Sequence, residues 1–276
     1  MNGSQLKVVN ISIVLYNTSL GDIENILSSL NRVELAYVLY IIDNSPSDTL
    51  KEYFQGKENI VYVHNPANPG FGASHNLVFQ KSIDENITYH FVVNPDVYFN
   101  SDVITAMVEY MNANSKVGMM MPQILNLDGS IQNLPKLLPS PFSLILRKLK
   151  APRFLYNRFI ERYELRGVAA NRVYKAPVLS GCFTVFRVEA LKEIGLYDDR
   201  FFMYFEDWDM SRRMYEKYET IYFPQVSVYH GYESGANKSQ RLFKIFIDSA
   251  KKYFNKWGWF VDKDRDNINK ETLNQF

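Results

Sequence analysis

Residues 8–16 read Val-Val-Asn-Ile-Ser-Ile-Val-Leu-Tyr, and this run decides the fold. An almost unbroken series of β-branched and other apolar residues is typical of a strand that is buried on both faces of a sheet. Apolar residues then recur at helical spacing from Leu20 to Leu30. A buried strand followed directly by an amphipathic helix indicates the start of an alternating α/β domain.

The alternation continues through the first half of the chain. Strand–helix alternation with short links predicts a parallel sheet with right-handed crossovers. Polar clusters follow three of the expected strands, at Asp43, at residues 68–76 and at residues 94–96. Ligands of such sheets bind outside the carboxyl ends of the strands, so a site is expected there. The further strands are predicted over residues 37–42, 60–63, 89–93 and 117–121, and the helices over 71–83 and 102–112.

The second half is less regular. Asp128-Gly129 predicts a hairpin turn, and Gly195 is placed to end a short helix. The sequence shows no repeat, low-complexity tract or linker, which favours one compact unit. A strand is predicted over residues 176–186, helices over 188–194 and 205–217, and two strands near 219–223 and 226–229.

Composition narrows the class of protein. The net charge is +1 and the pI is about 7.7, which argues against a nucleic-acid binder. The single cysteine, Cys182, stands in an apolar run, so we expect a buried, inert thiol and a reducing compartment. No apolar run reaches about 18 residues, so no membrane-spanning helix is predicted. The N-terminal residues are too polar and short for a signal peptide, and we expect a cytoplasmic protein.

Two acidic motifs point to chemistry. Asn94-Pro95-Asp96 follows a predicted buried strand, where a carboxylate can bind Mg²⁺ or Mn²⁺ together with substrate phosphates. The same triplet is also an ordinary turn. Glu206-Asp207-Trp208-Asp209 starts a predicted helix, and Glu206 or Asp207 is a candidate general base. Helix capping is the simpler explanation of acids at that position.

A glycine-containing loop and a histidine are weaker signals. Residues 68–76 read Asn-Pro-Gly-Phe-Gly-Ala-Ser-His-Asn, with two glycines before a helix that could approach an anion. The segment matches neither the phosphate loop nor the dinucleotide fingerprint. His230 follows an apolar strand and could be a second metal ligand or a structural residue.

Taken in order, these segments resemble the inverting family 2 glycosyltransferases of the GT-A fold, above all the rhamnosyltransferase-like branch that builds bacterial surface polysaccharides such as O-antigen or capsule. The wider family carries Asp-x-Asp at the metal site, and Asn94 replaces its first acid here. The matching segments are Ile13–Asn17, Ile42–Ser45, Asn68–Asn76, Asn94–Val97, Leu179–Cys182, Gly195–Asp198 with Phe201-Phe202, Tyr204–Asp209 and His230-Gly231.

The resemblance implies an α/β GT-A fold with a Rossmann-like, mostly parallel central sheet flanked by helices and a smaller acceptor-side β/α portion. It divides the chain into a transferase domain over residues 1–235, with a nucleotide-binding half (1–122) and an acceptor-side half (123–235), followed by a basic amphipathic helix and tail (236–276). It implies a divalent cation, Mg²⁺ or Mn²⁺, as cofactor.

The same resemblance implies a role for each matching residue. Asp207 is expected to be the base, with Glu206 as the alternative, and Asp96 and His230 are expected to bind the metal. Ser180, Gly181 and Trp208 are expected at the sugar and acceptor site. The nucleotide is expected to contact Tyr16, Asn17, Asp43, Asn68, Gly70, Gly72, Asn76 and Asn94.

Substrates follow from the resemblance in outline. It implies dTDP-rhamnose as donor, with a UDP-hexose or UDP-N-acetylhexosamine as the alternative, and a saccharide on a lipid carrier as acceptor. Basic and apolar residues alternate from Lys238 to Trp257, which predicts either a helix lying on an anionic membrane surface or a packing helix with solvated lysines. The basic stretch from Arg147 to Arg166 could extend the same surface.

Other classes fit the sequence less well. A sugar nucleotidyltransferase usually carries a basic glycine-rich loop near its N-terminus, whereas residues 16–21 hold no Lys or Arg. A non-catalytic sugar-nucleotide-binding module would not need the acidic cluster at residues 206–209. A dinucleotide-dependent oxidoreductase would need a glycine fingerprint after the first strand, and none is present.

Overall fold

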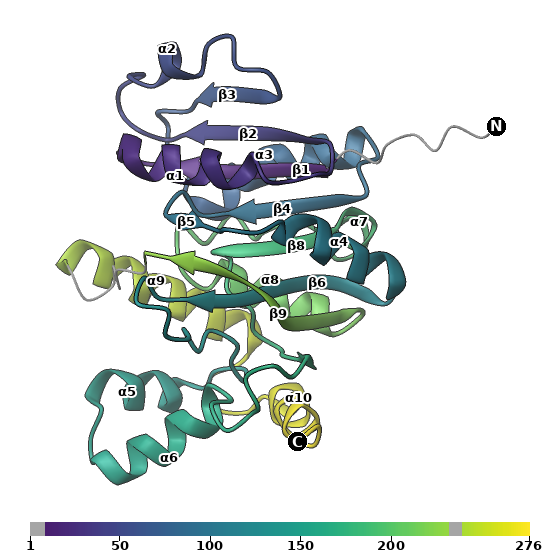
Figure 1. Ribbon diagram of the computed structural model, residues 1–276. Coiled ribbons are helices and arrows are strands. Elements are labelled where there is room, and N and C mark those ends of the chain that lie inside the picture. The colour runs from purple at the N-terminus through teal and green to yellow at the C-terminus, as the bar shows by residue number, and fades with distance from the viewer. Residues whose placement is uncertain (1–8, 232–238) are drawn as a thin grey trace.

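The computed structural model describes residues 9–231 and 239–276. The chain forms a central sheet with helices on both faces, as predicted (Figure 1). In its first half the strands are β1 (Val9–Leu15), β2 (Tyr37–Asp43), β3 (Ile60–His64), β4 (Tyr89–Val93) and β5 (Val97–Tyr98), and the helices are α1 (Leu20–Leu30), α2 (Lys51–Phe54), α3 (Phe71–Asp84) and α4 (Val103–Ala113).

The second half adds strands and helices of both kinds. The strands are β6 (Val117–Leu125), β7 (Tyr174–Lys175), β8 (Phe183–Arg187) and β9 (Glu219–His230). The helices are α5 (Pro141–Leu149), α6 (Arg153–Tyr163), α7 (Val188–Ile194), α8 (Glu206–Tyr215), α9 (Gln240–Trp257) and α10 (Lys263–Leu273).

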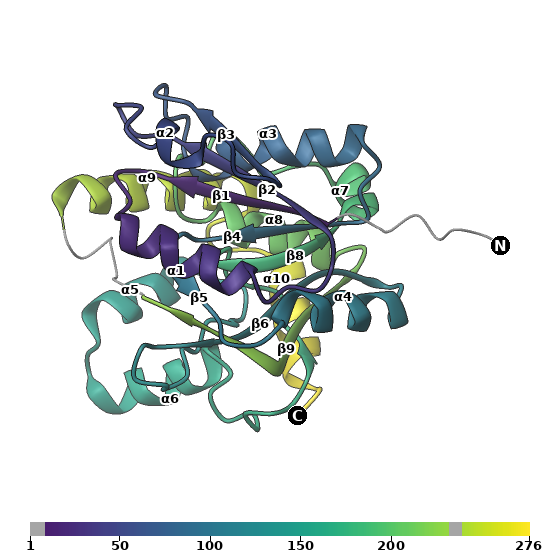
Figure 2. The ribbon, with the colours of Figure 1, turned by 45° about the horizontal axis from the view of Figure 1, so that its top comes forward.

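The sheet has the order β3-β2-β1-β4-β8-β6-β9-β5, with β7 paired to β9. The first four strands are parallel, which confirms the α/β prediction for this half. β8 is antiparallel to both of its neighbours, whereas β6 and β9 run parallel. Helices α1 and α4 lie on one face of the sheet and α3, α7 and α8 on the other (Figure 2). β1 and β4 are buried almost throughout, as their apolar sequences require.

Three predictions for the second half have clear outcomes. The turn at Asp128-Gly129 is confirmed, since the Asn126 N–H donates to the Ser130 carbonyl at 2.8 Å. The strand predicted over residues 176–186 was wrong in extent: only Phe183–Arg187 is strand, and the chain turns at residues 181–182. The two strands predicted between residues 219 and 229 are one strand, β9, whose pairing with β6 shifts register near Pro224. Proline lacks the N–H that a regular ladder needs, so an irregularity there is expected.

The C-terminal helices pack onto the rest of the chain. Tyr253 and Phe254 of α9 pack against Phe201 and Phe205 in a buried aromatic cluster. Arg212 of α8 donates two hydrogen bonds to the carboxylate of Asp262, which caps α10, at 2.7 and 2.8 Å. The division predicted at residue 235 stays a prediction, and residues 232–238 lie outside the described part of the chain.

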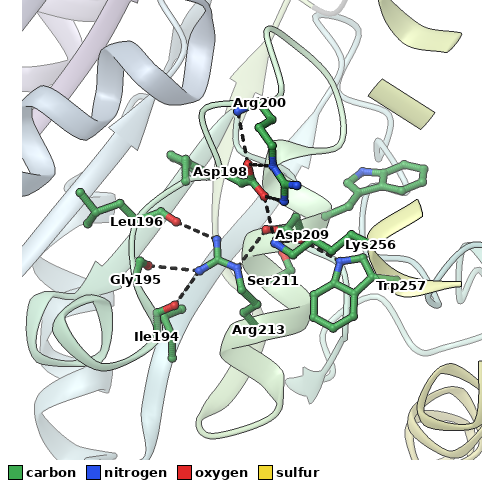
Figure 3. A network of polar contacts seen from close by, with 12 residues as sticks. Ile194, Gly195, Leu196, Asp198, Arg200, Asp209, Ser211, Arg213, Lys256 and Trp257 are labelled. Atoms are coloured by element: carbon green, nitrogen blue, oxygen red, sulfur yellow. Dashed lines mark hydrogen bonds and ion pairs between the residues drawn. The ribbon is translucent and has the colours of Figure 1, made fainter. Parts of the chain in front are cut away.

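Asp209 anchors α9 to α8 through a buried network (Figure 3). Its carboxylate accepts from Arg213 Nε at 2.9 Å and from Trp257 Nε1 at 2.8 Å, and Lys256 Nζ lies 2.7 Å away. Arg213 also donates to the carbonyls of Ile194 and Leu196, which fixes the loop after α7. Asp209 is fully buried. It is therefore the structural member of the acidic cluster at residues 206–209.

Replacing Asp209 with Asn should lower the free energy of unfolding by about 1–3 kcal/mol, because Arg213 and Lys256, both partly exposed, lose the buried carboxylate that pairs with them. Urea denaturation followed by circular dichroism measures the change. Asp199→Asn is the matched control: Asp199 is exposed, and its substitution should change stability by less than about 0.5 kcal/mol. Equal stability of both variants would contradict the anchoring role.

Candidate active site

Asp96 and His230 meet where β4 and β9 end. Asp96 belongs to the turn after β4, and the turn leads into β5, which pairs with the end of β9 so that Val97 lies opposite His230. His230 Nε2 lies 3.4 Å from Asp96 Oδ1, and the Gly231 N–H donates to the Asp96 carbonyl at 3.1 Å. Asn94 Nδ2 also lies 3.4 Å from His230 Nε2. The structure thus brings His230 to the Asn94-Pro95-Asp96 turn, two features that the sequence marked separately.

The imidazole of His230 is held in one orientation. Gln132 Oε1 lies 3.2 Å from His230 Nδ1, and Gln132 Nε2 donates to the His230 carbonyl at 2.9 Å. Both side chains are buried. A partner on one ring nitrogen fixes which way the other points, as in many metal-binding histidines. The arrangement therefore directs Nε2 at the carboxylate of Asp96.

Asp96 is suited to bind cations. Burial raises the pKa of its carboxyl, but the hydrogen bond and charge of His230 outweigh that effect, so its pKa lies below the usual value. One-third of the side chain remains exposed. It lines an open pocket of about 840 Å³ together with His230, Asp22 and Asn25 of α1, and Asn126. A carboxylate and an imidazole at a polar pocket fit Mg²⁺ or Mn²⁺ if phosphates complete the coordination.

Asp207 lies in the first turn of α8, after two residues with left-handed backbone. Tyr204 has φ 70° and Phe205 has φ 68°, a conformation that costs about 1–2 kcal/mol per non-glycine residue. Asp207 Oδ2 accepts from the Gly181 N–H at 3.1 Å, and Oδ1 from the Trp208 N–H at 2.9 Å. The strained entry of α8 is thus held by packing and places the carboxylate against the turn at residues 181–182.

Electrostatics sets the protonation of Asp207. Burial raises the pKa of its carboxyl to about 6, against the lowering effects of the Gly181 N–H and the positive charge of Lys136. Lys136 is itself buried, and burial lowers the pKa of its ammonium to about 8. A carboxyl with a pKa near 6 is ionised at neutral pH and basic enough to accept a proton, as a general base requires.

Glu206 has a different environment. Its side chain is buried, and Oε2 has no hydrogen-bond partner. Burial first, and the negative charge of Asp207 second, raise the pKa of Glu206 well above its usual value. A carboxyl in this state is neutral at pH 7, because a buried charge without a partner is costly. Of the two candidate bases, the structure therefore favours Asp207.

The turn at residues 181–182 connects Asp207 to the Asp96 site. The Gly181 N–H donates to Asp207, and the adjacent Cys182 carbonyl accepts from the Asn94 N–H at 2.8 Å. A Cβ on Gly181 would lie 3.4 Å from both the Asp207 Cβ and the Phe71 ring. The thiol of Cys182 is buried, and burial raises its pKa to about 12, so it is inert as predicted.

The predicted nucleotide residues lie along the same edge of the sheet. Tyr16, 49% exposed, and Asn17 follow β1, and the Asn17 N–H donates to Ser45 Oγ at 2.8 Å. Asp43 ends β2 and is fully buried, with its carboxylate accepting from the Tyr62 hydroxyl and the Ser45 N–H, both at 2.9 Å. Only β1 separates β2 from β4, so Asp43 and Asn94 end strands about 10 Å apart.

The 68–76 segment contacts protein. Gly70 has φ 105°, and a Cβ there would lie 2.2 Å from the Phe202 carbonyl oxygen, whereas one on Gly72 would lie 2.9 Å from the Tyr197 Cβ. Asn76 exchanges two hydrogen bonds with the Tyr197 backbone, at 2.8 and 3.0 Å. Asn68 has a left-handed backbone and bonds to Asn65. In this structure these residues fasten α3 to residues 197–206, and their nucleotide contacts stay a prediction.

Ser180 and Trp208 complete the predicted set. The Thr184 hydroxyl donates to the Ser180 carbonyl at 2.6 Å, and the Cys182 N–H lies 3.4 Å from Ser180 Oγ. Trp208 packs against Phe205, with ring centroids 4.6 Å apart, and is partly exposed. Neither residue lines the pocket at Asp96, so their role at a sugar site stays a prediction.

Sequence reasoning missed Lys136, Gln132 and Asp22. The signal for Lys136 was a lysine inside the apolar run Leu134 to Leu138. Gln132 gave no signal in the sequence, because its partner His230 is 98 positions away. The sequence around Asp22 suggests only helix capping. In the structure the Ser19 hydroxyl donates to the Asp22 carboxylate.

A model of the family described as glycosyl transferase family 2 matches residues 11–195, which include β1, Asp43, Asp96 and the 181–182 turn. The chain belongs to glycosyl transferase family 2. It is therefore a glycosyltransferase with the GT-A fold.

Two relatives of this glycosyltransferase are similar over most of its length. N-acetylglucosaminyl-diphospho-decaprenol L-rhamnosyltransferase of Mycobacterium tuberculosis is 25% identical over 224 residues, covering 75% of this chain and 71% of the relative. Low-salt glycan biosynthesis hexosyltransferase Agl10 of Haloferax volcanii is 23% identical over 254 residues, covering 90% of this chain and 76% of the relative.

Solved structures confirm the fold. GalNAc-T7, crystallised with UDP, GalNAc and Mn²⁺, superposes with a TM-score of 0.63 at 15% identity. That match covers 90% of this chain but only 48% of GalNAc-T7. Residues 1–349 of TarS from S. aureus superpose with a TM-score of 0.58 at 16% identity, covering 97% of this chain and 71% of TarS 1–349.

Two negative findings concern the described residues. Over residues 9–231 and 239–276, no helix is long and apolar enough to cross a bilayer. In the same part of the chain, no three His, Cys, Asp or Glu side chains gather as a ready-made metal site. A cation at Asp96 and His230 would therefore need further oxygen ligands, such as those of a bound diphosphate.

The buried state of Glu206 has a consequence for stability. Because the pKa of Glu206 is raised in the folded protein, the unfolded chain loses this proton first, and stability should fall as pH rises above about 4.5. Glu206→Gln removes this effect. Relative to the parent, the variant should gain up to about 1.4 kcal/mol per pH unit between pH 5 and 7. Urea unfolding at both pH values measures the gain, and a pH-independent difference would show that Glu206 is ionised in the folded state.

Proposed function

We propose that this glycosyltransferase moves L-rhamnose from dTDP-rhamnose to a saccharide on a lipid carrier. The observation that carries the proposal is the hydrogen-bonded link from Asp207 through residues 181–182 to Asn94, which puts a candidate base beside a candidate diphosphate site. The donor and acceptor are suggested by the mycobacterial relative, whose name specifies L-rhamnose transfer to N-acetylglucosaminyl-diphospho-decaprenol. A role in O-antigen, capsule or another surface polysaccharide follows from such an acceptor.

A second donor class has its own support. The Haloferax relative is named as a hexosyltransferase, and TarS and GalNAc-T7 were crystallised with UDP. A UDP-hexose or UDP-N-acetylhexosamine is therefore the alternative donor. Both proposals use the same site residues.

The proposed reaction is a single in-line displacement. Asp207 accepts the proton of an acceptor hydroxyl as its oxygen attacks the anomeric carbon, while the bond from that carbon to the diphosphate oxygen breaks. The developing charge resembles the oxocarbenium-like state of glycoside hydrolysis. One displacement inverts the anomeric configuration.

The chain prepares Asp207 for this step in two ways. The N–H groups of Gly181 and Trp208 orient the carboxylate, and Lys136 keeps its pKa from rising further. Asp96 and His230 are the residues that would hold the cation. When bound, a divalent cation would neutralise charge on the leaving nucleoside diphosphate.

Asp207→Asn should lower kcat by ~10²–10⁴-fold while donor binding persists, because the amide cannot accept the proton. In the parent enzyme, kcat/KM should fall about tenfold per pH unit below pH 6, where Asp207 becomes protonated. Steady-state assays from pH 5 to 8 measure both effects, with Asp199→Asn as control. Near-normal turnover of Asp207→Asn would exclude Asp207 as the base.

Nucleoside diphosphates should raise the melting temperature of the enzyme only when Mn²⁺ or Mg²⁺ is present, because a ligand of the folded state stabilises it by RT ln(1 + [L]/Kd). A larger shift with dTDP than with UDP supports the rhamnose donor, and the reverse supports the alternative. Asp96→Asn should abolish the cation-dependent part of the shift. An unchanged shift in that variant would remove Asp96 from the metal site.

A further inference from the structure

Helix α5 presents an uncovered stripe of large apolar side chains. Phe142, Ile145 and Leu149 are 65%, 53% and 65% exposed, and their spacing puts them on one face of the helix. The helix is well formed, since Ser140 and Ser143 make a reciprocal capping box and Pro141 occupies the first turn. Isolated exposed apolar residues are normal, but a contiguous row of them marks an interaction surface.

The stripe continues onto two neighbouring helices. Phe154, at the start of α6, is 73% exposed. Phe243 of α9 is 38% exposed, and Lys148 Nζ lies 4.7 Å from its ring centroid, which ties α5 to α9. These residues define the α5 patch, which consists of Phe142, Ile145, Leu149, Phe154 and Phe243.

The α5 patch lies in a strongly basic part of the chain. Residues 140–160 contain Arg147, Lys148, Lys150, Arg153 and Arg158 but no Asp or Glu. Arg147 lies 3.8 Å from Glu164. Lys150, Arg153 and Arg158 are exposed, and none of them forms an ion pair with any residue in the described ranges. The apolar surface is thus bordered by three exposed cations that form no ion pair within the described ranges.

The position of the patch relates it to the active site. In Figure 1, α5 and α6 project from the sheet on the side toward which β4 and β9 point. Asp96 and His230 lie at those strand ends. A surface that binds the α5 patch therefore approaches the enzyme from the side of its candidate active site.

We propose that the α5 patch docks on an anionic lipid bilayer. Its apolar side chains enter the boundary between headgroups and acyl chains, and Lys150, Arg153 and Arg158 contact lipid phosphates. A bilayer fits better than an acidic protein, because the patch combines exposed large apolar side chains with exposed cations and the proposed acceptor is itself attached to a lipid. The inference rests on the proposed function in this last respect only.

The docking element differs from the one that the sequence suggested. Helix α9 is largely a packing helix: Tyr253 and Phe254 are buried against Phe201 and Phe205. Lys252 donates to the Arg200 carbonyl at 2.6 Å, and Lys256 pairs with Asp198 and Asp209. Only the first turns of α9, around Phe243, reach the patch. The basic stretch from Arg147 to Arg166, which the sequence suggested as an extension of that surface, becomes the main docking element.

Co-sedimentation of the full chain with vesicles tests the proposal. The enzyme should bind vesicles of phosphatidylcholine and phosphatidylglycerol, bind phosphatidylcholine alone at least about tenfold more weakly, and dissociate as salt rises. Ile145→Ser/Leu149→Ser should weaken binding about tenfold through lost apolar burial. Arg153→Gln/Arg158→Gln should weaken it by a similar factor through lost charge.

The control variant Val61→Ser/Leu77→Ser changes two exposed apolar residues outside the patch, 39% and 54% exposed, and should bind as the parent does. Circular dichroism melting checks that each variant folds. No binding of the parent to anionic vesicles, equal binding to neutral and anionic vesicles, or equal binding of patch and control variants would each overturn the proposal. Vesicle binding without transfer from dTDP- or UDP-sugars to a detergent-dispersed lipid-linked saccharide would instead refute the proposed function alone.

Discussion

The proposed active site depends on the backbone of one short turn. The Gly181 N–H holds the carboxylate of Asp207, and the Cys182 carbonyl holds the Asn94 N–H at the start of the Asn-Pro-Asp turn. Two segments that are more than 100 positions apart are thereby kept in a fixed relation. A Cβ on residue 181 would lie 3.4 Å from Asp207 and Phe71, an ordinary van der Waals distance, so main-chain hydrogen bonds hold the turn rather than the lack of a side chain. The candidate base and the candidate diphosphate site are thus positioned by main-chain groups, which cannot change rotamer.

Adjacent carboxyl groups on α8 have three different states because their surroundings differ. Glu206 is buried and its Oε2 has no hydrogen-bond partner, so the pKa of its carboxyl lies well above the usual value. Asp207 has backbone hydrogen bonds and the nearby charge of Lys136, and its pKa is about 6, whereas Asp209 pairs with Arg213 and Lys256. Asp209 also supports the position of Asp207. By fixing α9 and the loop after α7, Asp209 helps to hold the left-handed residues Tyr204 and Phe205, from which α8 begins.

The sheet was predictable from sequence because its periodicity is local. Neighbouring residues in the chain are enough to predict the strand at residues 8–16, the helix that ends at Gly195 and the polar strand ends. The strand predicted over 176–186 failed because residues 176–182 are buried by tertiary packing without a ladder partner along their whole length. The contacts of Asn76 and Gly72 with Tyr197 could not be predicted, because Tyr197 is more than 120 positions away. The hydrogen bond of Gln132 with His230 leaves no local pattern, and the effect of the Lys136 charge on Asp207 leaves only a lysine inside an apolar run.

The most direct test is a crystal structure of the enzyme with Mn²⁺ and a nucleoside diphosphate, with the metal located by anomalous scattering. The account predicts a single strong peak bonded to the Asp96 carboxylate and the diphosphate, near His230, with the nucleoside lying along the ends of β1 and β2. A peak held by other acidic residues, or a diphosphate bound away from the turn at residues 181–182, would contradict it.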